Sequence, residues 1–343
     1  MAISIIREIV QRSGASRRTV LRVLAEGGPA CRPSLMARAQ QIRALADELG
    51  YRPNAAARAM NTGRFHAIGM LLGDDVRVSS HVPPTFLEEV LSLLAVSGLN
   101  MVMSSLSDVV LSDQQRAPNL LRELAVDGLL VMYDVGAPEG LVDLLTRKAG
   151  PLIWVNRRVE QDGVRPDDIG AGRLATELAL RRGHRRIAYL DPLHEDDRRT
   201  NRLHYSKEDR LSGYRTQMEA AGLAPQVILD PLWSEWNRLD SARAMLADPG
   251  RPSAFICQNA VEAGILMLGA SQLGLSVPRD VSLMILTGGS GECFSGLKQP
   301  DREMGRAAVA QLTRRMAKTT IHLPTMLVPY TEQLGATLAE PPR

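Results

Sequence analysis

The chain of 343 residues contains only three cysteines, Cys31, Cys257 and Cys293, which lie far apart and form no Cys-x-x-Cys pair. This spacing argues against a disulfide-stapled scaffold and against a cysteine zinc cluster, and it is typical of a reducing cytoplasm. No apolar run approaches the roughly 18 residues that a membrane helix requires, and the N-terminus lacks the long apolar core of a signal peptide. We therefore expect a cytoplasmic protein with no membrane segment.

Aromatic residues are also scarce, at 4% of the chain. Proteins that bind single-stranded nucleic acids stack bases on aromatic side chains, so the composition argues against that class. The net charge of +3 is unevenly distributed: residues 1–64 hold eleven arginines and four acidic residues, a net charge of +7, which leaves −4 for the remainder. A small basic module on a mildly acidic body favours a polyanion-binding head attached to a separate domain.

Residues 15–24 give the clearest local pattern. Val20, Val23 and Leu24 are three and four residues apart, so they share one face of a helix. The opposite face is basic and carries Arg17, Arg18 and Arg22. Ser16 is placed to cap this helix, and an amphipathic segment before it stops at Gly14. Helix, glycine turn and capped basic helix form the helix-turn-helix pattern, although an ordinary solvated helix has the same distribution of charge.

A third amphipathic segment covers residues 34–49 and ends at Gly50, a common residue after a helix C-terminus. Two motifs stand out in residues 14–58: Gly14-x-Ser16-x-x-Thr19-Val20-x-Arg22-Val23-Leu24 and Gly50-Tyr51-x-Pro53-Asn54-x-x-Ala57-Arg58. Further matches are Val126-Asp127-Gly128-Leu129, Gly183-His184-Arg185-Arg186, Arg210-Leu211-Ser212-Gly213-Tyr214 and Gly274-Leu275-x-Val277-Pro278. In this order the chain closely resembles the lactose-repressor (LacI) family of bacterial transcription regulators, and the resemblance extends to about residue 306.

The resemblance implies duplex DNA as one partner. Arginine is the favoured partner of guanine in the major groove, so Arg17, Arg18 and Arg22 are the expected readers of base edges. Ser16, Thr19 and Asn54 are expected at the phosphates. The alanine-rich segment 54–61 is either a plain linker or the family's hinge helix, which orders when two copies meet on DNA. In the hinge reading Ala57 and Met60 join the DNA-binding surface, with Met60 in place of the leucine that family members insert into the minor groove.

From Ala67 onward, short apolar runs alternate with amphipathic stretches. The runs predict strands at 67–73, 99–104, 128–132, 151–156, 186–190, 226–230, 253–257 and 281–286. The stretches predict helices at 85–97, 170–182, 206–221, 234–247 and 259–273. This alternation is typical of doubly wound parallel sheets, and the number of strands favours two lobes with a ligand site at the strand carboxyl ends.

The expected fold is therefore an all-α helix-turn-helix head followed by an α/β periplasmic-binding-protein-like sensor of two doubly wound parallel-sheet lobes. The expected head covers residues 1–53, and the hinge and linker cover 54–65. The resemblance implies that the chain crosses between lobes near 159–164, 288–295 and 319–323. The first lobe would then comprise 66–160 with 291–320, and the second 161–290 with 321–337.

Motifs for catalysis, metals or cofactors find little support. Gly170-Ala171-Gly172-Arg173-Leu174-Ala175 fits a dinucleotide fingerprint, but this fingerprint needs a buried strand directly before it, where Arg165-Pro166-Asp167-Asp168 stands. Close packing of a helix on its neighbour explains the glycines equally well. His194 begins an acidic run without a second histidine at metal-binding spacing, so a solvated loop is the expectation. We expect no enzyme activity, cofactor or metal.

The effector site departs from the sugar-binding members of the family. Asn156, Asn259-Ala260 and Leu286-Thr287 stand where those members place acidic residues, while Arg210 is retained. An arginine without carboxylates suits an anion, so a sugar acid or sugar phosphate is the expected small-molecule effector. It would be held by Arg210 with Asn156, Asn259 and Thr287, and Phe86 is a candidate cover for one face. The competing interpretation makes Arg210 a structural residue paired with Asp168.

The resulting expectation is a homodimeric, sequence-specific DNA-binding regulator, of the repressor type, that recognises a palindromic operator and is controlled by an effector between its lobes. Two other classes stay open. A cytoplasmic NAD-dependent oxidoreductase rests on residues 170–175 alone and predicts a dinucleotide in the purified protein. A solute-binding module explains two lobes but leaves the basic residues 1–64 without a role.

Overall fold

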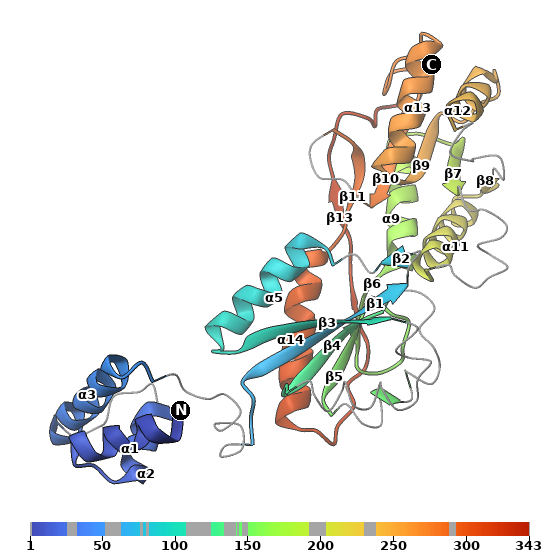
Figure 1. Cartoon of the computed structure of the whole chain (residues 1–343). Helices are drawn as coiled ribbons and strands as arrows, with labels where there is room; N and C mark the ends of the chain where they lie inside the picture. Colours follow the sequence, from blue (N-terminus) through green and yellow to red (C-terminus); the bar gives the residue numbers. More distant parts are fainter. Residues whose placement is uncertain are drawn as a thin grey trace. The chain divides into compact units, whose positions relative to one another are not determined.

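The computed structural model describes residues 2–25, 33–51, 63–75, 78–79, 82–107, 125–133, 142, 144–145, 150–191, 204–229, 238–287 and 293–342 (Figure 1). The chain divides into a small unit of residues 1–67 with 125–127, and a large unit of residues 68–124 with 128–343. Among the described residues no helix is long and apolar enough to cross a membrane.

The small unit begins with three helices, α1 (Ala2–Ser13), α2 (Arg17–Ala25) and α3 (Pro33–Glu48). Their apolar faces meet in a core in which Ile9, Val20 and Ile42 are fully buried. Gly14 makes the turn between α1 and α2 with a φ of +63°, a conformation that glycine adopts without a Cβ penalty. The three helices predicted from periodicity are confirmed: α1 ends before Gly14 as expected, and the ends of α2 and α3 lie within one or two residues of those predicted.

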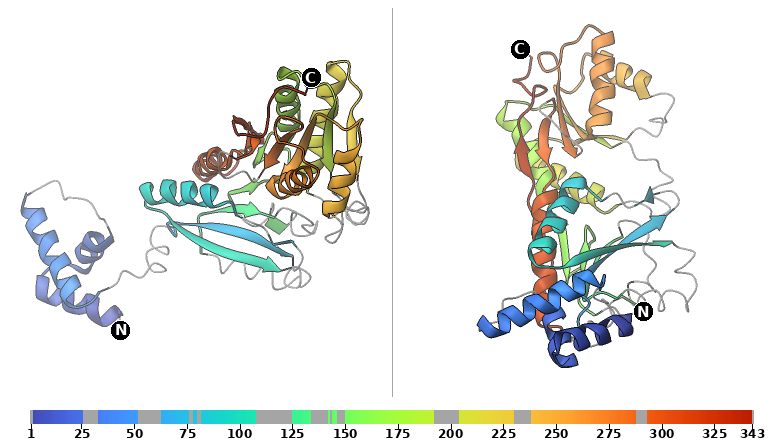
Figure 2. Two further views of the ribbon diagram at one scale, coloured as in Figure 1. Left: turned by 90° about the horizontal axis from the view of Figure 1, so that it is seen from above. Right: turned by 60° about the vertical axis from the view of Figure 1, so that its left-hand side comes forward.

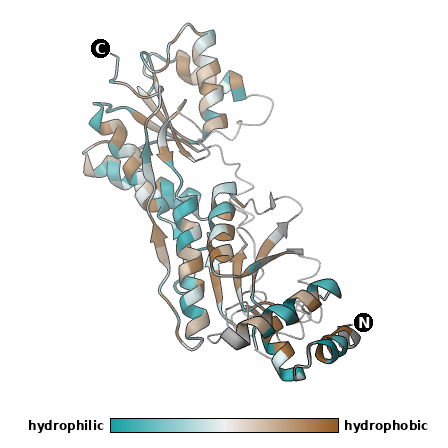
Figure 3. Ribbon diagram, turned by 90° about the vertical axis from the view of Figure 1, so that its left-hand side faces the viewer, coloured by the Kyte–Doolittle hydropathy of each residue, from teal (hydrophilic) through white to brown (hydrophobic). Residues whose placement is uncertain are grey.

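The first sheet of the large unit has the strand order β12-β6-β5-β4-β1-β2, with β3 also paired to β1. The strands are β1 (Ala67–Asp75), β2 (Val78–Ser79), β3 (Asn100–Ser107), β4 (Gly128–Met132), β5 (Leu152–Val155), β6 (Gly163–Pro166) and β12 (Met326–Val328). Helices α5 (Pro84–Val96) and α14 (Asp301–Ala317) share one hydrophobic core with these strands. Figure 3 shows the strands as the most hydrophobic part of this layer, beside helices of mixed character.

The second sheet has the order β13-β11-β10-β9-β7-β8. Its strands are β7 (Ile187–Asp191), β8 (Gln226–Leu229), β9 (Ala254–Asn259), β10 (Ser282–Thr287), β11 (Ser295–Lys298) and β13 (Thr331–Gln333). Alternate strand residues enter two different cores, because successive side chains of a strand point to opposite faces. Helices α9 (Asp168–Arg181) and α11 (Ser206–Ala220) cover one face, and α12 (Arg238–Ala247) and α13 (Ala260–Gln272) cover the other (Figure 2).

The chain crosses between the two sheets later than the resemblance implied. β6 pairs with β5 and β12, so residues 163–166 belong to the first sheet rather than the second lobe. β11 pairs in parallel with β10 in the second sheet, although residues 291–320 were expected in the first lobe. β12 belongs to the first sheet and only β13 to the second. These strands are three or four residues long, too short for a hydrophobic period to mark their sheet.

One glycine of the dinucleotide-like motif, Gly172, serves helix packing together with Gly213 of α11. A Cβ on Gly172 would collide with the carbonyl of Arg210, and one on Gly213 would collide with the carbonyl of Ile169, so these glycines let α9 and α11 approach closely. The expectation that no strand precedes the motif is wrong, because β6 ends at Pro166. However, β6 lies in the first sheet while α9 packs on the second, so the two do not form the strand–helix unit that holds a dinucleotide.

Candidate functional site

The N-terminus of α2 is held by two hydroxyl side chains. The Thr19 backbone N–H donates to Ser16 Oγ over 3.2 Å, and the two hydroxyl oxygens lie 2.9 Å apart. This is the cap that the sequence predicted, and it satisfies a backbone donor that helices leave without an intrahelical partner. Ser16 is exposed and Thr19 is half-buried, so the start of α2 remains accessible to a partner.

The outer face of α2 is a cationic surface made by Arg17, Arg18 and Arg22, all of them exposed. Within the described part of the chain, none of these three guanidinium groups forms an ion pair. Two other arginines of the head have structural partners: Arg12 bonds Glu48 over 2.9 Å, and Arg38 donates to the Gly14 carbonyl over 3.0 Å. The head therefore uses some arginines for its own fold, whereas those of α2 have no ion-pair partner among the described residues.

Asn54, Ala57 and Met60 lie outside the described residues. Their expected roles in the hinge, and the hinge helix itself, stay predictions.

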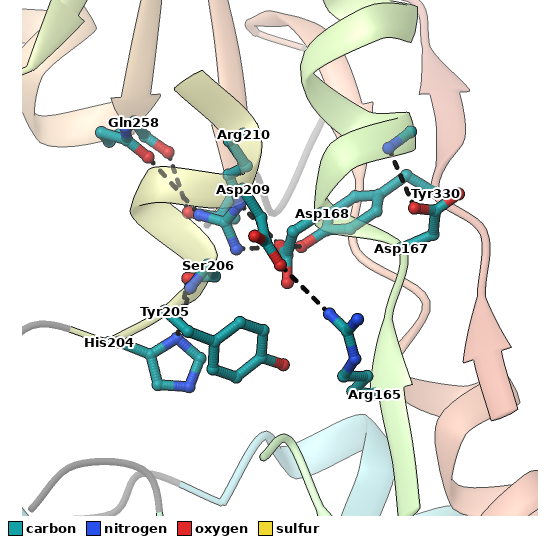
Figure 4. Close-up of polar contacts among 12 residues, drawn as sticks. Arg165, Asp167, Asp168, His204, Tyr205, Ser206, Asp209, Arg210, Gln258 and Tyr330 are labelled. Atoms are coloured by element: carbon teal, nitrogen blue, oxygen red, sulfur yellow. Dashed lines mark hydrogen bonds and ion pairs between the residues drawn. The ribbon is translucent and has the colours of Figure 1, made fainter. Parts of the chain in front are cut away.

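A second cluster surrounds Arg210 on α11, and we name it the arginine cluster (Figure 4). Arg210 Nε donates to Asp168 Oδ1 over 2.8 Å and Nη2 donates to the Tyr330 hydroxyl over 3.0 Å. Nη1 makes a longer bond of 3.4 Å to Gln258 Oε1, and Tyr330 itself donates to Asp168 Oδ1. Burial opposes the charge of Arg210, but Tyr330 and Asp168 raise its pKa above the usual value. Arg210 is thus a cation held by partners on α9, on β9 and just before β13.

The surroundings of Asp168 disfavour its negative charge. Its side chain is completely buried, and its Oδ2 atom has no hydrogen-bond partner in the described structure. Burial raises the pKa of Asp168, and attraction to Arg210 offsets only part of this rise. The carboxylate and the guanidinium therefore depend on each other, because either charge alone would be buried without compensation.

The start of α11 also contacts β6 and the segment between β5 and β6. Asp209 accepts from Arg165 over 3.1 Å and from Arg158. The same two guanidinium groups lie over the Tyr205 ring, that of Arg158 at 5.4 Å and that of Arg165 at 5.3 Å from its centroid, a geometry suited to cation–π attraction. Its hydroxyl donates to Asn156 Oδ1 over 3.3 Å. These contacts join residues of the second sheet's layer to the carboxyl ends of two strands of the first sheet.

His204 adds a buried neutral group to this junction. Burial lowers the pKa of His204 to about 4, so the ring is neutral near pH 7. Its Nε2 lies 3.1 Å from the Asn156 carbonyl, which can only accept, so Nε2 carries the proton. Nδ1 then accepts from the Ser206 hydroxyl over 2.7 Å. Asn156 itself has a φ of +57°, in the left-handed region that asparagine adopts more readily than most residues with a Cβ.

The structure changes the roles of the expected effector residues. Arg210 does have a carboxylate partner, so the premise that it lacks one is wrong. The Asn259 side chain caps α13 by accepting from Val261 and Glu262 N–H groups, and the Thr287 hydroxyl donates to the Gln258 carbonyl over 2.8 Å. Phe86 is 1% exposed in the core between α5 and the first sheet, so it packs there and covers no ligand face. Of the five, Asn156 and Arg210 lie in or beside the arginine cluster.

Several residues of the arginine cluster and of the contacts beside it were not predicted from the sequence. These are Arg158, Arg165, His204, Tyr205, Asp209, Gln258 and Tyr330. Arg158 and Arg165 stand just after or within strands of the first sheet, where ligand sites occur, and this position could have drawn attention to them. Tyr330 is 120 residues from its partner Arg210, and no local pattern indicates such a pairing.

Comparisons with known proteins agree with this architecture. Residues 176–336 match the model of the periplasmic binding protein-like domain. The HTH-type transcriptional repressor PurR of Photobacterium profundum is 26% identical over 327 residues, which cover 91% of each chain. The maltose regulon regulatory protein MalI of Escherichia coli is 25% identical over 351 residues, covering 94% of this chain and 96% of MalI. A lac repressor dimer bound to operator and the anti-inducer ONPF has a TM-score of 0.73 at 19% identity, covering 96% of this chain and 98% of that one.

The fold and the basic surface of α2 define the class of this protein: a helix-turn-helix head with a basic outer helix, followed by a periplasmic-binding-protein-like body. Over nearly its whole length the chain is similar to transcription repressors and regulators such as PurR and MalI, and it shares the fold of the lac repressor.

Proposed function

We propose that this protein is a transcriptional repressor that acts in the cytoplasm, binds a palindromic operator as a homodimer through α2 and has no catalytic role. The observation that carries the proposal is the outer face of α2, where three exposed arginines have no ion-pair partner in the described structure. A helix of this kind fits the major groove, and its guanidinium groups can bind guanine O6 and N7 in bidentate fashion. The names of the relatives, PurR and MalI among them, support a regulatory role.

Selection of the full-length protein on a pool of random DNA duplexes tests the proposal. We expect enrichment of one approximately palindromic sequence, because the two heads of a dimer are related by a two-fold axis. We refer to this sequence as the selected operator. Enrichment of no sequence, or of a single unrepeated half-site, would contradict repression through a dimer on a palindrome.

We further propose that the effector is a small anion with hydroxyl groups, a sugar acid or sugar phosphate, bound at the junction between the two sheets. Because Arg210 is already paired with Asp168, we expect the anion to contact Arg157 and Arg158, beyond the end of β5. Arg158 shares the single carboxylate of Asp209 with Arg165. Arg157 stacks 5.2 Å from the Trp154 ring and bonds the Tyr133 carbonyl, and burial lowers its pKa. Among the described residues, Asp209 is the carboxylate that pairs with this group of three arginines, and such an excess of guanidinium groups favours an anionic ligand.

A thermal-shift screen that pairs neutral sugars with their acids and phosphates tests this ligand class. An anionic ligand should raise the melting temperature by mass action, and Arg157→Ala or Arg158→Ala should abolish the shift. Arg181→Ala is the matched control, since Arg181 is exposed and pairs with Glu332 on the second sheet. Stabilisation by a neutral sugar that survives both substitutions would contradict the anion.

The contacts between α11 and the ends of β5 and β6 supply a route for regulation. A ligand that competes for Arg158 or for the Asn156 carbonyl would change how the two sheets' layers meet. Such a ligand regulates DNA binding only by its different affinity for the two arrangements. In this proposal the hinge residues, Met60 with its expected wedge in the minor groove among them, respond to that change.

A further inference from the structure

One carboxylate holds the backbone where the chain enters the large unit. The N–H of Phe65 donates to Asp127 Oδ1 over 2.7 Å, and the N–H of His66 donates to Asp127 Oδ2 over 2.8 Å. The Asp127 N–H in turn donates to the Ala67 carbonyl over 2.7 Å. Both carboxylate oxygens and the backbone N–H of Asp127 are therefore engaged by three consecutive residues at the end of the linker and the start of β1, and hydrogen bonds to a charged acceptor are the stronger kind.

We call these hydrogen bonds between Asp127 and residues 65–67 the clamp, and they lie where two strands of the first sheet begin. Asp127 immediately precedes β4, and the clamped residues immediately precede or begin β1. β1 and β4 are neighbours, with Ile68 beside Gly128 at the first pair of their register. The clamp therefore extends the pairing of these strands backward onto the linker, just after the segment 54–61.

The backbone at the clamp is strained in one place. His66 has a φ of +56°, a left-handed conformation that a residue with a Cβ seldom adopts. Such a conformation persists only where the surrounding contacts hold it, and the Asp127 carboxylate accepts the N–H of this residue. The chain thus turns at His66 in a direction that the free peptide would not prefer.

We infer that Asp127 is a positioning residue that fixes the direction in which the linker leaves the body, and so sets the operator spacing that a dimer accepts. The inference rests on the proposed function. If the two linkers of a dimer start in fixed directions, the two heads reach half-sites at one separation only. If the clamp is released, each linker samples several directions, and the effective concentration of the second head at its half-site falls.

The test compares the full-length protein and its Asp127→Ala variant on three duplexes: the selected operator and two derivatives with a single base pair inserted or removed at the centre. For the wild-type protein we expect each derivative to reduce the affinity by about 100-fold, because simultaneous binding through both heads is prevented. Asp127→Ala should bind the selected operator about 10-fold more weakly than the wild-type protein does. The affinity of this variant for either derivative should be less than about threefold below its affinity for the selected operator.

Asp280→Ala is the matched control, because this carboxylate also accepts a backbone N–H, from Ser276 over 2.7 Å, but in the second sheet's layer. It should keep the wild-type spacing preference. Asp127→Asn retains one accepting oxygen and should give an intermediate preference, and it replaces Asp127→Ala if that variant does not fold by circular dichroism. A folded variant with the wild-type spacing penalty would overturn the inference. Failure of the wild-type protein to select any palindrome would instead overturn the proposed function.

Discussion

Replacing Arg22 by alanine is expected to weaken binding to the selected operator by about 1–3 kcal/mol, and Arg17→Ala and Arg18→Ala should have effects of the same size wherever the arginine binds a base in bidentate fashion. The reason is that these guanidinium groups are exposed and have no ion-pair partner in the described structure, so their removal is expected to break bonds to DNA but no ion pair among the described residues. Binding to a random duplex should fall much less, since it depends mainly on total charge. Fluorescence anisotropy on both duplexes at fixed salt measures the two changes in affinity.

Arg12→Ala is the control for this series. It removes one positive charge from the same head, but Arg12 bonds Glu48 on α3 and does not belong to the outer face of α2. It should reduce the affinities for operator and random duplex by similar, small factors. If the α2 substitutions also weakened both duplexes equally, their arginines would be phosphate contacts and another part of the head would read the sequence.

Removing Asp168 should have the largest effect on stability. Asp168→Ala leaves Arg210 as a buried cation without its carboxylate, and breaking a buried pair in this way costs about 3–5 kcal/mol. Arg210→Met in the same chain removes the second charge and should recover much of that stability, because a fully apolar replacement of a buried pair is often neutral. Urea denaturation followed by circular dichroism gives the free energies of unfolding, and the double-mutant cycle gives the coupling.

The exposed pair between Arg181 and Glu332 provides the comparison for Asp168. Its atoms are 3.1 Å apart, but both side chains are at least 40% exposed, so Glu332→Ala should cost no more than about 1 kcal/mol. An Asp168→Ala variant that is as stable as Glu332→Ala would show that Arg210 finds another partner or water. A double variant less stable than Asp168→Ala would show that the guanidinium is needed for its bonds to Tyr330 and Gln258.

Local patterns predicted the elements well where a whole face is buried. The run 128–132 coincides with β4, whose five residues are all buried, and the period of residues 15–24 located α2 together with its cap. Helix α14 was not among the predicted elements, and β6, β11, β12 and β13 escaped because they are too short to show a period. Their membership in one sheet or the other depends on pairing with strands far along the chain.

The α2 surface and the arginine cluster also differ in how far local sequence patterns predict them. The α2 surface was predictable because its residues are neighbours on one helix and their exposure follows from the apolar residues opposite. The arginine cluster was not, since Arg210 meets Asp168 and Tyr330 from 42 and 120 residues away. The family resemblance gave Arg210 as an effector contact, which stays a prediction, whereas its pairing with Asp168 depends on which side chain faces it in the fold.

The ratio of affinities of the full-length protein for the selected operator and for a scrambled duplex of the same length tests the central claim most directly. Measured by fluorescence anisotropy at physiological salt, the ratio should be about 1,000 or more, as for sequence-specific DNA-binding proteins. It should fall steeply when Arg17, Arg18 and Arg22 are replaced together. A ratio near one for the wild-type protein would contradict sequence-specific binding by the head.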